Sequence, residues 1–455
     1  MSTQPSRVLS MPRTFVEVED DVAPAIAARL NVALFAGLCV VLFATPLAMG
    51  AVFAWSVFAI EIAATVLFLL WVARELCSER VRAIWNPVFA PAVLFACVIA
   101  VQVAFHTSAV GFLTRQEAVK YVAYGLLLFV ATQAVRSESE YRRFAAVAIA
   151  LGLAVALFGI VQSLTSNGRV YWLFKPESGS YIFGPYVNRN HFAGLMELLA
   201  PLALVTTTIL KALTPGKRAL LAFATMIMGG SVVLSLSRGG MLGLAAEILL
   251  LGIYVASRRA LRPAMLLIGA CALMSAFLWW VGSEQLIHRF SSETGGGMSA
   301  QARLNITRSA LTMARQRPIL GWGLGTFATV YPPFRNFYGD RYVNEAHNDY
   351  AQVLVETGML GLAALLWLAA LLMIAAKRRA RYAQSDLREA IRLGLIVGCA
   401  GLLVHSFVDF NLQIPANAAL FYVFAGLAAA RSDHLFVKTP VNEKRVEWAV
   451  RPLKG

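Results

Sequence analysis

Long apolar segments recur along the whole chain, and they constrain its fold more than any motif does. Each segment has about 20 residues, enough for one α-helix to cross the hydrocarbon core of a bilayer. The chain is 58% hydrophobic and 14% charged, whereas soluble domains contain roughly 25% charged residues. Because backbone groups in lipid must be hydrogen-bonded within their own segment, these segments predict helices. We therefore expect an all-α integral membrane protein.

Twelve segments are apolar and long enough to be transmembrane helices. The last one is short and begins just after Pro415. The first follows about 30 mostly polar residues and lacks a small-residue cleavage site, so we interpret it as a true span rather than a cleaved signal peptide. The predicted spans lie near 31–49, 52–72, 88–105, 118–135, 144–163, 192–210, 219–235, 240–257, 263–281, 350–376, 391–408 and 416–430.

Lysine and arginine residues set the orientation of these spans. They gather in alternate short connections and in both tails, which predicts that both ends of the chain lie in the cytoplasm. The formal charge of +15 is therefore mainly a topology signal and does not indicate a nucleic-acid partner. The predicted organisation is a cytoplasmic tail (1–30), spans one to nine (31–281, with an outside loop at 164–190), a long outside loop (282–349), spans ten to twelve (350–430) and a cytoplasmic tail (431–455).

Cysteine and histidine spacing predicts no disulfide framework and no metal site. The chain has five cysteines: Cys77 lies in a cytoplasmic connection, and the others lie within spans. None falls in a predicted outside loop, where an oxidising environment would favour disulfides. No Cys-x-x-Cys or His-x-x-x-His spacing supports zinc.

A polar island, Glu345-Ala346-His347-Asn348-Asp349-Tyr350, closes the long outside loop and leads directly into the tenth span. An imidazole beside fixed positive charge suits proton abstraction near a phosphorylated substrate. We therefore expect enzyme chemistry in this loop. The same loop carries seven arginines: Arg289, Arg303, Arg308, Arg315, Arg317, Arg335 and Arg341.

Three sequence blocks in this part of the chain resemble the O-antigen ligase/polymerase family. They are Ser235-Leu236-Ser237-Arg238-Gly239-Gly240, then Arg303 followed by Arg317-Pro318-Ile319-Leu320-Gly321-Trp322-Gly323-Leu324-Gly325, and Ala346-His347-Asn348-Asp349-Tyr350 with Leu354-Val355-Glu356-Thr357-Gly358. Their order and spacing match the family's shared region, here about residues 220–375. The ten residues between His347 and Gly358 match its histidine-anchored motif.

The resemblance implies an inverting glycosyltransferase that needs no metal or cofactor and faces the periplasm from the bacterial inner membrane. Its donor would be a glycan on undecaprenyl diphosphate, and its acceptor a hydroxyl of a glycan, of lipid A-core or of another molecule, with both substrates held at the membrane lipid. Carried over by position, Arg238 and Arg303 would bind the diphosphate, and His347 would act at the acceptor hydroxyl. Guanidinium groups suit this role, because negative charge grows on a departing diphosphate.

Each of these residues also has a structural interpretation. Arg238 could be an interfacial anchor, and His347 a helix-start residue beside an Asn348-Asp349 cap. Asp349 is a candidate substrate-binding residue, which could instead cap the tenth span or orient His347. Arg335 and Arg341 are candidate sugar-binding residues, with a solvated loop face as the alternative.

A second polar cluster is predicted on the same side of the membrane. Asn190 and His191 enter the sixth span, and His405 with Asp409 ends the eleventh. These side chains could line a groove for glycan or acceptor. For His405 we favour a hydrogen bond between spans.

Two questions of function remain open at the level of sequence. Ligases of the family are described with a second motif, an arginine followed after ten residues by glycine, and no arginine of the long loop here has that glycine. A polysaccharide polymerase with the same donor chemistry is therefore the alternative to a ligase. Glu61, Glu197 and Glu247 lie within spans and support a rival class, a proton-coupled or anion transporter.

Overall fold

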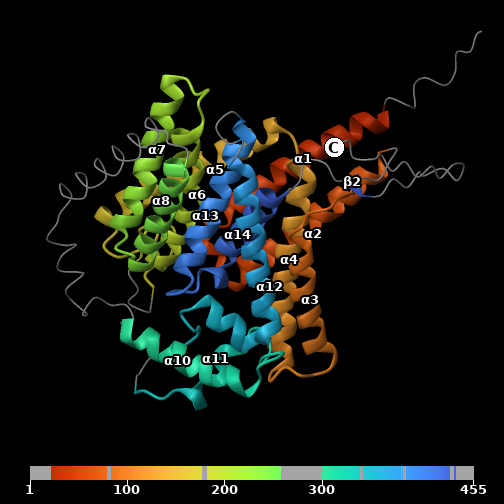
Figure 1. Cartoon of the computed structure of the whole chain (residues 1–455). Coiled ribbons are helices and arrows are strands. Elements are labelled where there is room, and N and C mark those ends of the chain that lie inside the picture. The colour runs from red at the N-terminus through yellow and green to blue at the C-terminus, as the bar shows by residue number, and fades with distance from the viewer. Residues whose placement is uncertain are drawn as a thin grey trace, which may run out of the picture.

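The computed structural model of the protein describes residues 22–78, 83–176, 182–257, 300–338, 342–380, 382, 386–430 and 435–436. Figure 1 shows a bundle of long helices, with α10 and α11 across one end. The predicted all-α class is confirmed. The predicted ninth span at 263–281 and the first part of the long loop lie outside the described residues, as do Arg341 and most of both tails.

Twelve long helices lie within the described residues. They are α1 (Val22–Ala44), α2 (Ala54–Leu76), α3 (Phe89–Ala104), α4 (Gly111–Ala134), α5 (Glu138–Thr165), α6 (Arg189–Ile209), α7 (Pro215–Leu234), α8 (Arg238–Ser257), α10 (Ala300–Gln316), α12 (Asp349–Arg379), α13 (Leu387–His405) and α14 (Pro415–Ala429). The short elements are η1 (Met49–Ala51), α11 (Phe327–Val330), η2 (Pro332–Phe334), η3 (Asn411–Gln413), and the two-residue strands β1 (Ala83–Ile84) and β2 (Leu435–Phe436).

Seven helices within the described ranges are long and apolar enough to cross a membrane: Ala25–Ala44 of α1, and α2, α5, α6, α7, α8 and α12. Four further predicted spans coincide with α3, α4, α13 and α14. Of these, α3 and α14 have only 16 and 15 residues, and α4 and α13 carry charged residues in their N-terminal halves. Twelve membrane crossings therefore remain a prediction.

Helix α6 is the centre of the bundle. Every residue in its 18-residue apolar window is buried, and α5, α7, α8, α13 and α14 pack around it. All residues of α14 except Tyr422 are also buried. Because their neighbours are protein rather than lipid, these helices tolerate polar side chains that a lipid-facing helix would not.

Polar residues before each span fix where the helices at the site begin. Asn188 precedes α6 and accepts a hydrogen bond from the backbone N–H of Asn190. Asn348 does the same for α12 through Ala351 N–H. Such caps satisfy backbone donors that the first turn leaves without partners.

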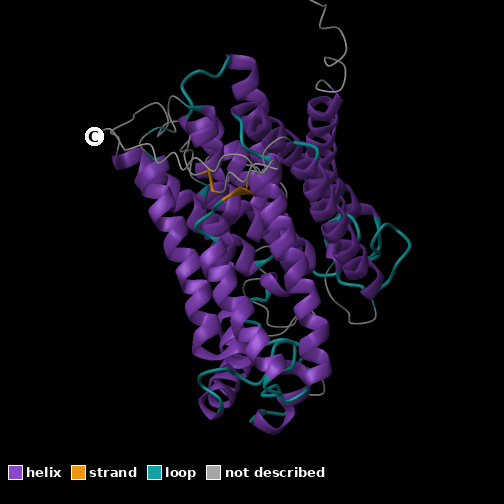
Figure 2. Ribbon diagram, turned by 90° about the vertical axis from the view of Figure 1, so that its right-hand side faces the viewer, coloured by secondary structure: helices purple, strands orange, loops and turns teal. Residues whose placement is uncertain are grey.

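The two ends of the bundle differ in chemistry. Helices α6, α10 and α12 begin beside the connection from α13 to α14, at the end that α10 and α11 cover (Figure 1). The last turn of α12, at the other end, carries Lys377, Arg378 and Arg379. Strands β1 and β2 pair antiparallel away from α10 and α11 (Figure 2). The cytoplasmic assignment of this end stays a prediction.

Candidate active site

The connection between α13 and α14, residues 406–414, is the structural centre of the site. Three helices direct their first turns at it: α6 through Asn190, α10 through Arg303 and α12 through Asp349. The connection carries Asp409, whose side chain is fully buried. Residues from four separate parts of the chain therefore converge on one short loop.

The Asp409 carboxylate is surrounded by groups that favour its charge. Its Oδ2 lies 3.3 Å from Nη1 of Arg303 and accepts a hydrogen bond from the side-chain amide of Asn190. Its Oδ1 lies 3.8 Å from Nε2 of His191 and 3.9 Å from Nδ1 of His347. Four of the predicted site residues thus meet at Asp409.

Phe410 holds the two histidines apart. Its ring centroid lies 4.7 Å from that of His191 and 4.8 Å from that of His347, with both imidazoles nearly perpendicular to it. The phenyl ring therefore fixes both imidazoles beside the Asp409 carboxylate. His347 itself has a φ of 50°, a backbone conformation that side-chain-bearing residues seldom adopt outside functional sites and turns.

Charge and burial set opposite protonation preferences at this site. Burial by itself raises the pKa of Asp409, but the Arg303 guanidinium and the imidazoles of His191 and His347 hold it well below its usual range. Burial, together with smaller effects of Arg303 and His191, lowers the pKa of His347 to about 4, against an opposing effect of Asp409. At neutral pH the pair is a carboxylate beside a neutral imidazole.

Asp349 holds the loop in place. Its backbone N–H donates to the Ser406 carbonyl at 2.9 Å, and its fully buried carboxylate accepts from Leu412 N–H at 3.1 Å. Asn348, not Asp349, caps α12. The Asp349 carboxylate is thus committed to the loop, and substrate binding by this residue stays a prediction.

Arg238 is the first residue of α8. The Ser237 hydroxyl accepts from Gly240 N–H at 3.1 Å and so acts as the cap of this helix. Arg238 is exposed. A helix N-terminus carries a partial positive charge, so a cation here is unfavourable for the helix but adds to the attraction for an anion.

The first turn of α8 packs against the same loop. A Cβ atom on Gly239 would lie 3.1 Å from Cγ2 of Val408 and 2.4 Å from two ring atoms of His405. Arg303 approaches Val408 from α10 and donates to its carbonyl. The start of α8, which carries Arg238, and Arg303 of α10 therefore lie against the same loop.

The Arg-Pro-x-x-Gly-Trp-Gly-x-Gly block, residues 317–325, forms a separate structural unit with α12. Gly358 interrupts α12 with a φ of 66°, and a Cβ atom there would lie 2.1 Å from the Ile319 carbonyl oxygen. Trp322 N–H donates to the Val355 carbonyl at 2.8 Å. The block therefore docks into a break in α12, eleven residues after His347, and its glycines serve this close backbone contact.

The remaining predicted residues lie further along the cap formed by α10 and α11. Arg335 follows η2, where its guanidinium stacks on the ring of Phe337 at 4.7 Å. Arg341 lies outside the described residues. Among the described side chains, no group of three His, Cys, Asp or Glu is placed to hold a metal ion.

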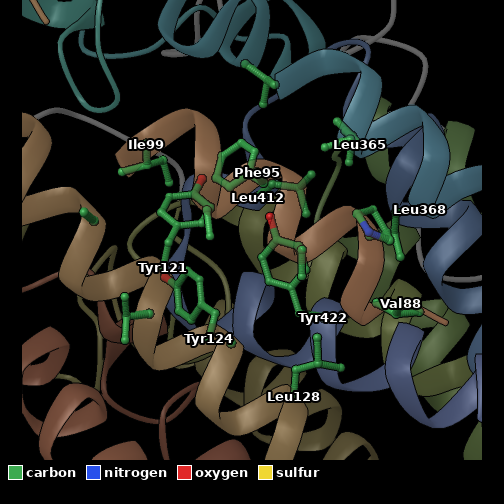
Figure 3. A pocket seen from close by; sticks show the side chains of 18 of the residues that line it. Val88, Phe95, Ile99, Tyr121, Tyr124, Leu128, Leu365, Leu368, Leu412 and Tyr422 are labelled. Carbon is green, nitrogen blue, oxygen red and sulfur yellow. The ribbon is translucent and has the colours of Figure 1, made fainter. Parts of the chain in front are cut away.

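An apolar cavity of about 230 Å³ borders the loop at Leu412 (Figure 3). Helices α3, α4, α12 and α14 form its walls, and Leu412 and Gln413 extend it to the loop that carries Asp409. Tyr121, Tyr124 and Tyr422 place their rings in it. Its lining suits a hydrocarbon chain far better than a sugar.

Asp409 is more central than its sequence position indicates. The sequence places it among several groove residues, whereas in the structure it contacts Arg303, Asn190, His191 and His347. The available signal was an aspartate at the outer end of a span, where an unpaired carboxylate is costly. His405 makes a hydrogen bond between spans, as we favoured, with its Nδ1 3.0 Å from Glu197.

Comparison with known proteins agrees with the motif blocks. No curated protein matches the chain. Residues 223–366 match the family model described as O-antigen ligase. This range contains Arg238, Arg303, His347 and the Gly358 break, while Asn190, His191 and Asp409 lie outside it. Residues 223–366 are therefore similar to the O-antigen ligase family, within a multi-pass helical membrane protein.

Proposed function

We propose that the protein transfers a glycan from undecaprenyl diphosphate to an acceptor hydroxyl, as an O-antigen ligase of the periplasmic face of the bacterial inner membrane. The observation that carries this proposal is the meeting of Arg303 and His347 at Asp409, with Arg238 at the start of α8 against the same loop. The family match supports ligase- or polymerase-type glycosyl transfer in general. The donor and the acceptor are our proposal.

The arginine side of the site suits the donor diphosphate. When the anomeric C–O bond breaks, its electron pair stays with the diphosphate, so negative charge grows there. Arg238 and the N-terminus of α8 offer positive charge to it, and Arg303 adds a guanidinium from α10. Fixed donors of this kind stabilise the developing charge without having to reorganise.

The histidine side suits the acceptor. A separation of 3.9 Å between Nδ1 of His347 and Asp409 exceeds a hydrogen-bond length, but the carboxylate favours a proton on Nδ1 over one on Nε2. Nε2 of His347 then takes the hydroxyl proton of the acceptor substrate while the hydroxyl oxygen forms its bond to the anomeric carbon. The products are the glycosylated acceptor and undecaprenyl diphosphate, and His347 is left as an imidazolium stabilised by Asp409.

Donor binding would also strengthen the base. In the protein without bound donor, His347 has a pKa near 4 and is therefore a weak proton acceptor. A diphosphate beside it adds negative charge, which raises the pKa of a neighbouring imidazole. The base would thus become effective once the donor is bound.

The apolar cavity fits the same scheme. Both proposed substrates are anchored in the membrane, and a hydrocarbon chain in the cavity would place its polar head near Leu412 and the loop.

A polysaccharide polymerase would use the same donor, the same arginines and the same base. Cells lacking a ligase would accumulate long glycans on the lipid carrier, whereas cells lacking a polymerase would carry single repeats.

The test separates the two halves of the site. Purified protein is incubated with a lipid-diphosphate glycan, and release of undecaprenyl diphosphate is measured together with donor binding. We expect His347→Asn to bind donor normally but to transfer about 100- to 10,000-fold more slowly. Arg238→Ala and Arg303→Ala should weaken donor binding, with lysine at either position restoring it only in part.

A transporter would behave differently. Its activity would depend on Glu197 or Glu247 and be indifferent to His347. Full activity of His347→Asn across the pH range would show that the histidine is structural and that the proposed chemistry is wrong.

A further inference from the structure

Glu197 of α6 and His405 of α13 form a buried pair that the proposed reaction does not use. Nδ1 of His405 lies 3.0 and 3.1 Å from the two carboxylate oxygens of Glu197, and neither side chain is exposed. Ionisable groups inside a helical bundle are costly unless they are paired, and they are retained mainly where they serve a function. A function for the Glu197–His405 pair is therefore expected.

The pair lies directly against the backbone of α8. A Cβ atom on Gly239 would lie 2.4 Å from Nε2 and Cδ2 of His405, and one on Gly243 would lie 2.4 Å from Oε1 of Glu197. These glycines are four residues apart and so share one face of the helix. The absence of side chains on this face lets the His405–Glu197 pair contact α8 along its first two turns.

Glu247 extends the same face by one more turn. A Cβ atom on Gly401 of α13 would lie 2.2 Å from Oε1 of Glu247, so this side chain fills a notch in the neighbouring helix. Three close contacts therefore fix the position of α8: His405 against Gly239, Glu197 against Gly243, and Glu247 against Gly401. The contact nearest the N-terminus of α8 is at Gly239, the residue that follows Arg238.

We infer that Glu197 and His405 are positioning residues for Arg238. Glu197 fixes the rotation of the imidazole, the imidazole supports the backbone at Gly239, and this support sets where the first turn of α8 presents Arg238. The inference rests on the proposed function, in which Arg238 binds the donor diphosphate. Neither residue touches substrate in this scheme.

The hydrogen bond between Nδ1 of His405 and Glu197 sets the orientation of the imidazole ring. If Glu197 accepts from Nδ1–H, the opposite edge of the ring, with Nε2 and Cδ2, faces Gly239. Without an acceptor at position 197 the ring can turn about its Cβ–Cγ bond, and the first turn of α8 loses a fixed contact. A neutral amide at 197 would still accept this hydrogen bond.

A matched pair of variants tests this point. Binding of undecaprenyl diphosphate is measured with the full-length protein in nanodiscs. Glu197→Leu, which removes the acceptor, should weaken binding roughly tenfold. Glu197→Gln keeps an acceptor and should stay within about twofold of the wild type. Equal losses in the two variants would overturn the role of this hydrogen bond.

A double-substitution cycle then separates positioning from general destabilisation. In the Arg238→Ala background, Glu197→Leu and His405→Leu should cause no further loss of diphosphate binding, because the group that they position is gone. Additive losses would mean that the pair acts on the fold as a whole, and would overturn the inference. Thermal unfolding of each variant, followed by tryptophan fluorescence, reports the folded fraction used to normalise binding.

Failure of the proposed function gives a different result. If Arg238→Ala binds undecaprenyl diphosphate as tightly as the wild type, Arg238 does not hold the donor, and the anion site itself is misassigned. If Arg238→Ala weakens binding but Glu197→Leu and His405→Leu do not, the anion site stands and only the positioning role is wrong.

Discussion

The Nδ1 atom of His347 lies 3.9 Å from Oδ1 of Asp409, across more than sixty residues of sequence. The same carboxylate contacts Arg303 through Oδ2. One buried charge therefore faces both the proposed base and a proposed donor-binding group. Loss of that charge should affect both halves of the reaction at once.

Asp409→Asn should slow transfer by about 100- to 10,000-fold, the contribution of a positioned general base. The amide keeps the shape of the side chain but no longer favours a proton on Nδ1 of His347 or balances Arg303. The measurement is glycan transfer by purified protein at saturating donor.

Asp386→Asn is the matched control for this substitution. Asp386 caps α13 through Glu389 N–H, and asparagine caps a helix about as well as aspartate. This variant should transfer at close to the wild-type rate. If Asp409→Asn did the same, the carboxylate would have no part in the chemistry.

The pH dependence of the reaction should report the state of His347. Because the folded protein lowers the pKa of this imidazole to about 4, the neutral, base-competent form predominates above that pH and is lost by protonation below it. For the free enzyme, kcat/KM should therefore fall only as the pH drops toward 4. Bound diphosphate raises the pKa, so kcat should begin to fall at a higher pH.

Rates measured from pH 3.5 to 8 at low and at saturating donor give the two profiles. A single acidic limb near pH 6.5 in both profiles, the value of an unperturbed histidine, would contradict the burial of His347. Buffers of constant ionic strength are needed, because the donor contacts are electrostatic.

The sequence predicted the class of fold and most helix positions because both depend on local apolar composition. It also singled out Arg238, Arg303 and His347 as candidates, since they lie in ordered motif blocks. It could not predict that Arg303 and His347 would meet at Asp409. That contact depends on the packing of α6, α10, α12 and α13, which no local pattern encodes.

The assignment of Asp349 shows the same limit. A carboxylate beside His347 in sequence is a natural candidate to orient the histidine. In the structure, the first turn of α12 directs it to Leu412 N–H, and Asp409, distant in sequence, occupies the place beside the imidazole. Sequence proximity was a poor guide because His347 precedes the helix and Asp349 belongs to it.

Topology can be tested independently of activity. Reporter fusions after residue 320 and after residue 382 should lie on opposite sides of the membrane, because α12 separates them and has 31 residues, longer than the roughly 20 needed to cross. The fusion at 320 should report the periplasm. A cytoplasmic signal there would reverse the orientation and remove the site from the side where we place the donor.

Gly358→Ala should both destabilise the protein and abolish transfer. The residue has a φ of 66° and a ψ of −167°, a conformation essentially confined to glycine, which costs a side chain about 1–3 kcal/mol. A Cβ atom would also lie 2.1 Å from the Ile319 carbonyl oxygen, so residues 317–325 must leave the break in α12. That movement should shift the start of α12, and with it His347.

Gly216→Ala is the control, because a Cβ atom at Gly216 meets nothing within 4 Å. Near the start of a helix, alanine should leave the unfolding temperature unchanged or slightly raised. Thermal unfolding and glycan transfer are measured for both variants. If Gly358→Ala unfolds at the wild-type temperature and transfers normally, the break in α12 does not position His347, and the ten-residue spacing between His347 and Gly358 has some other cause.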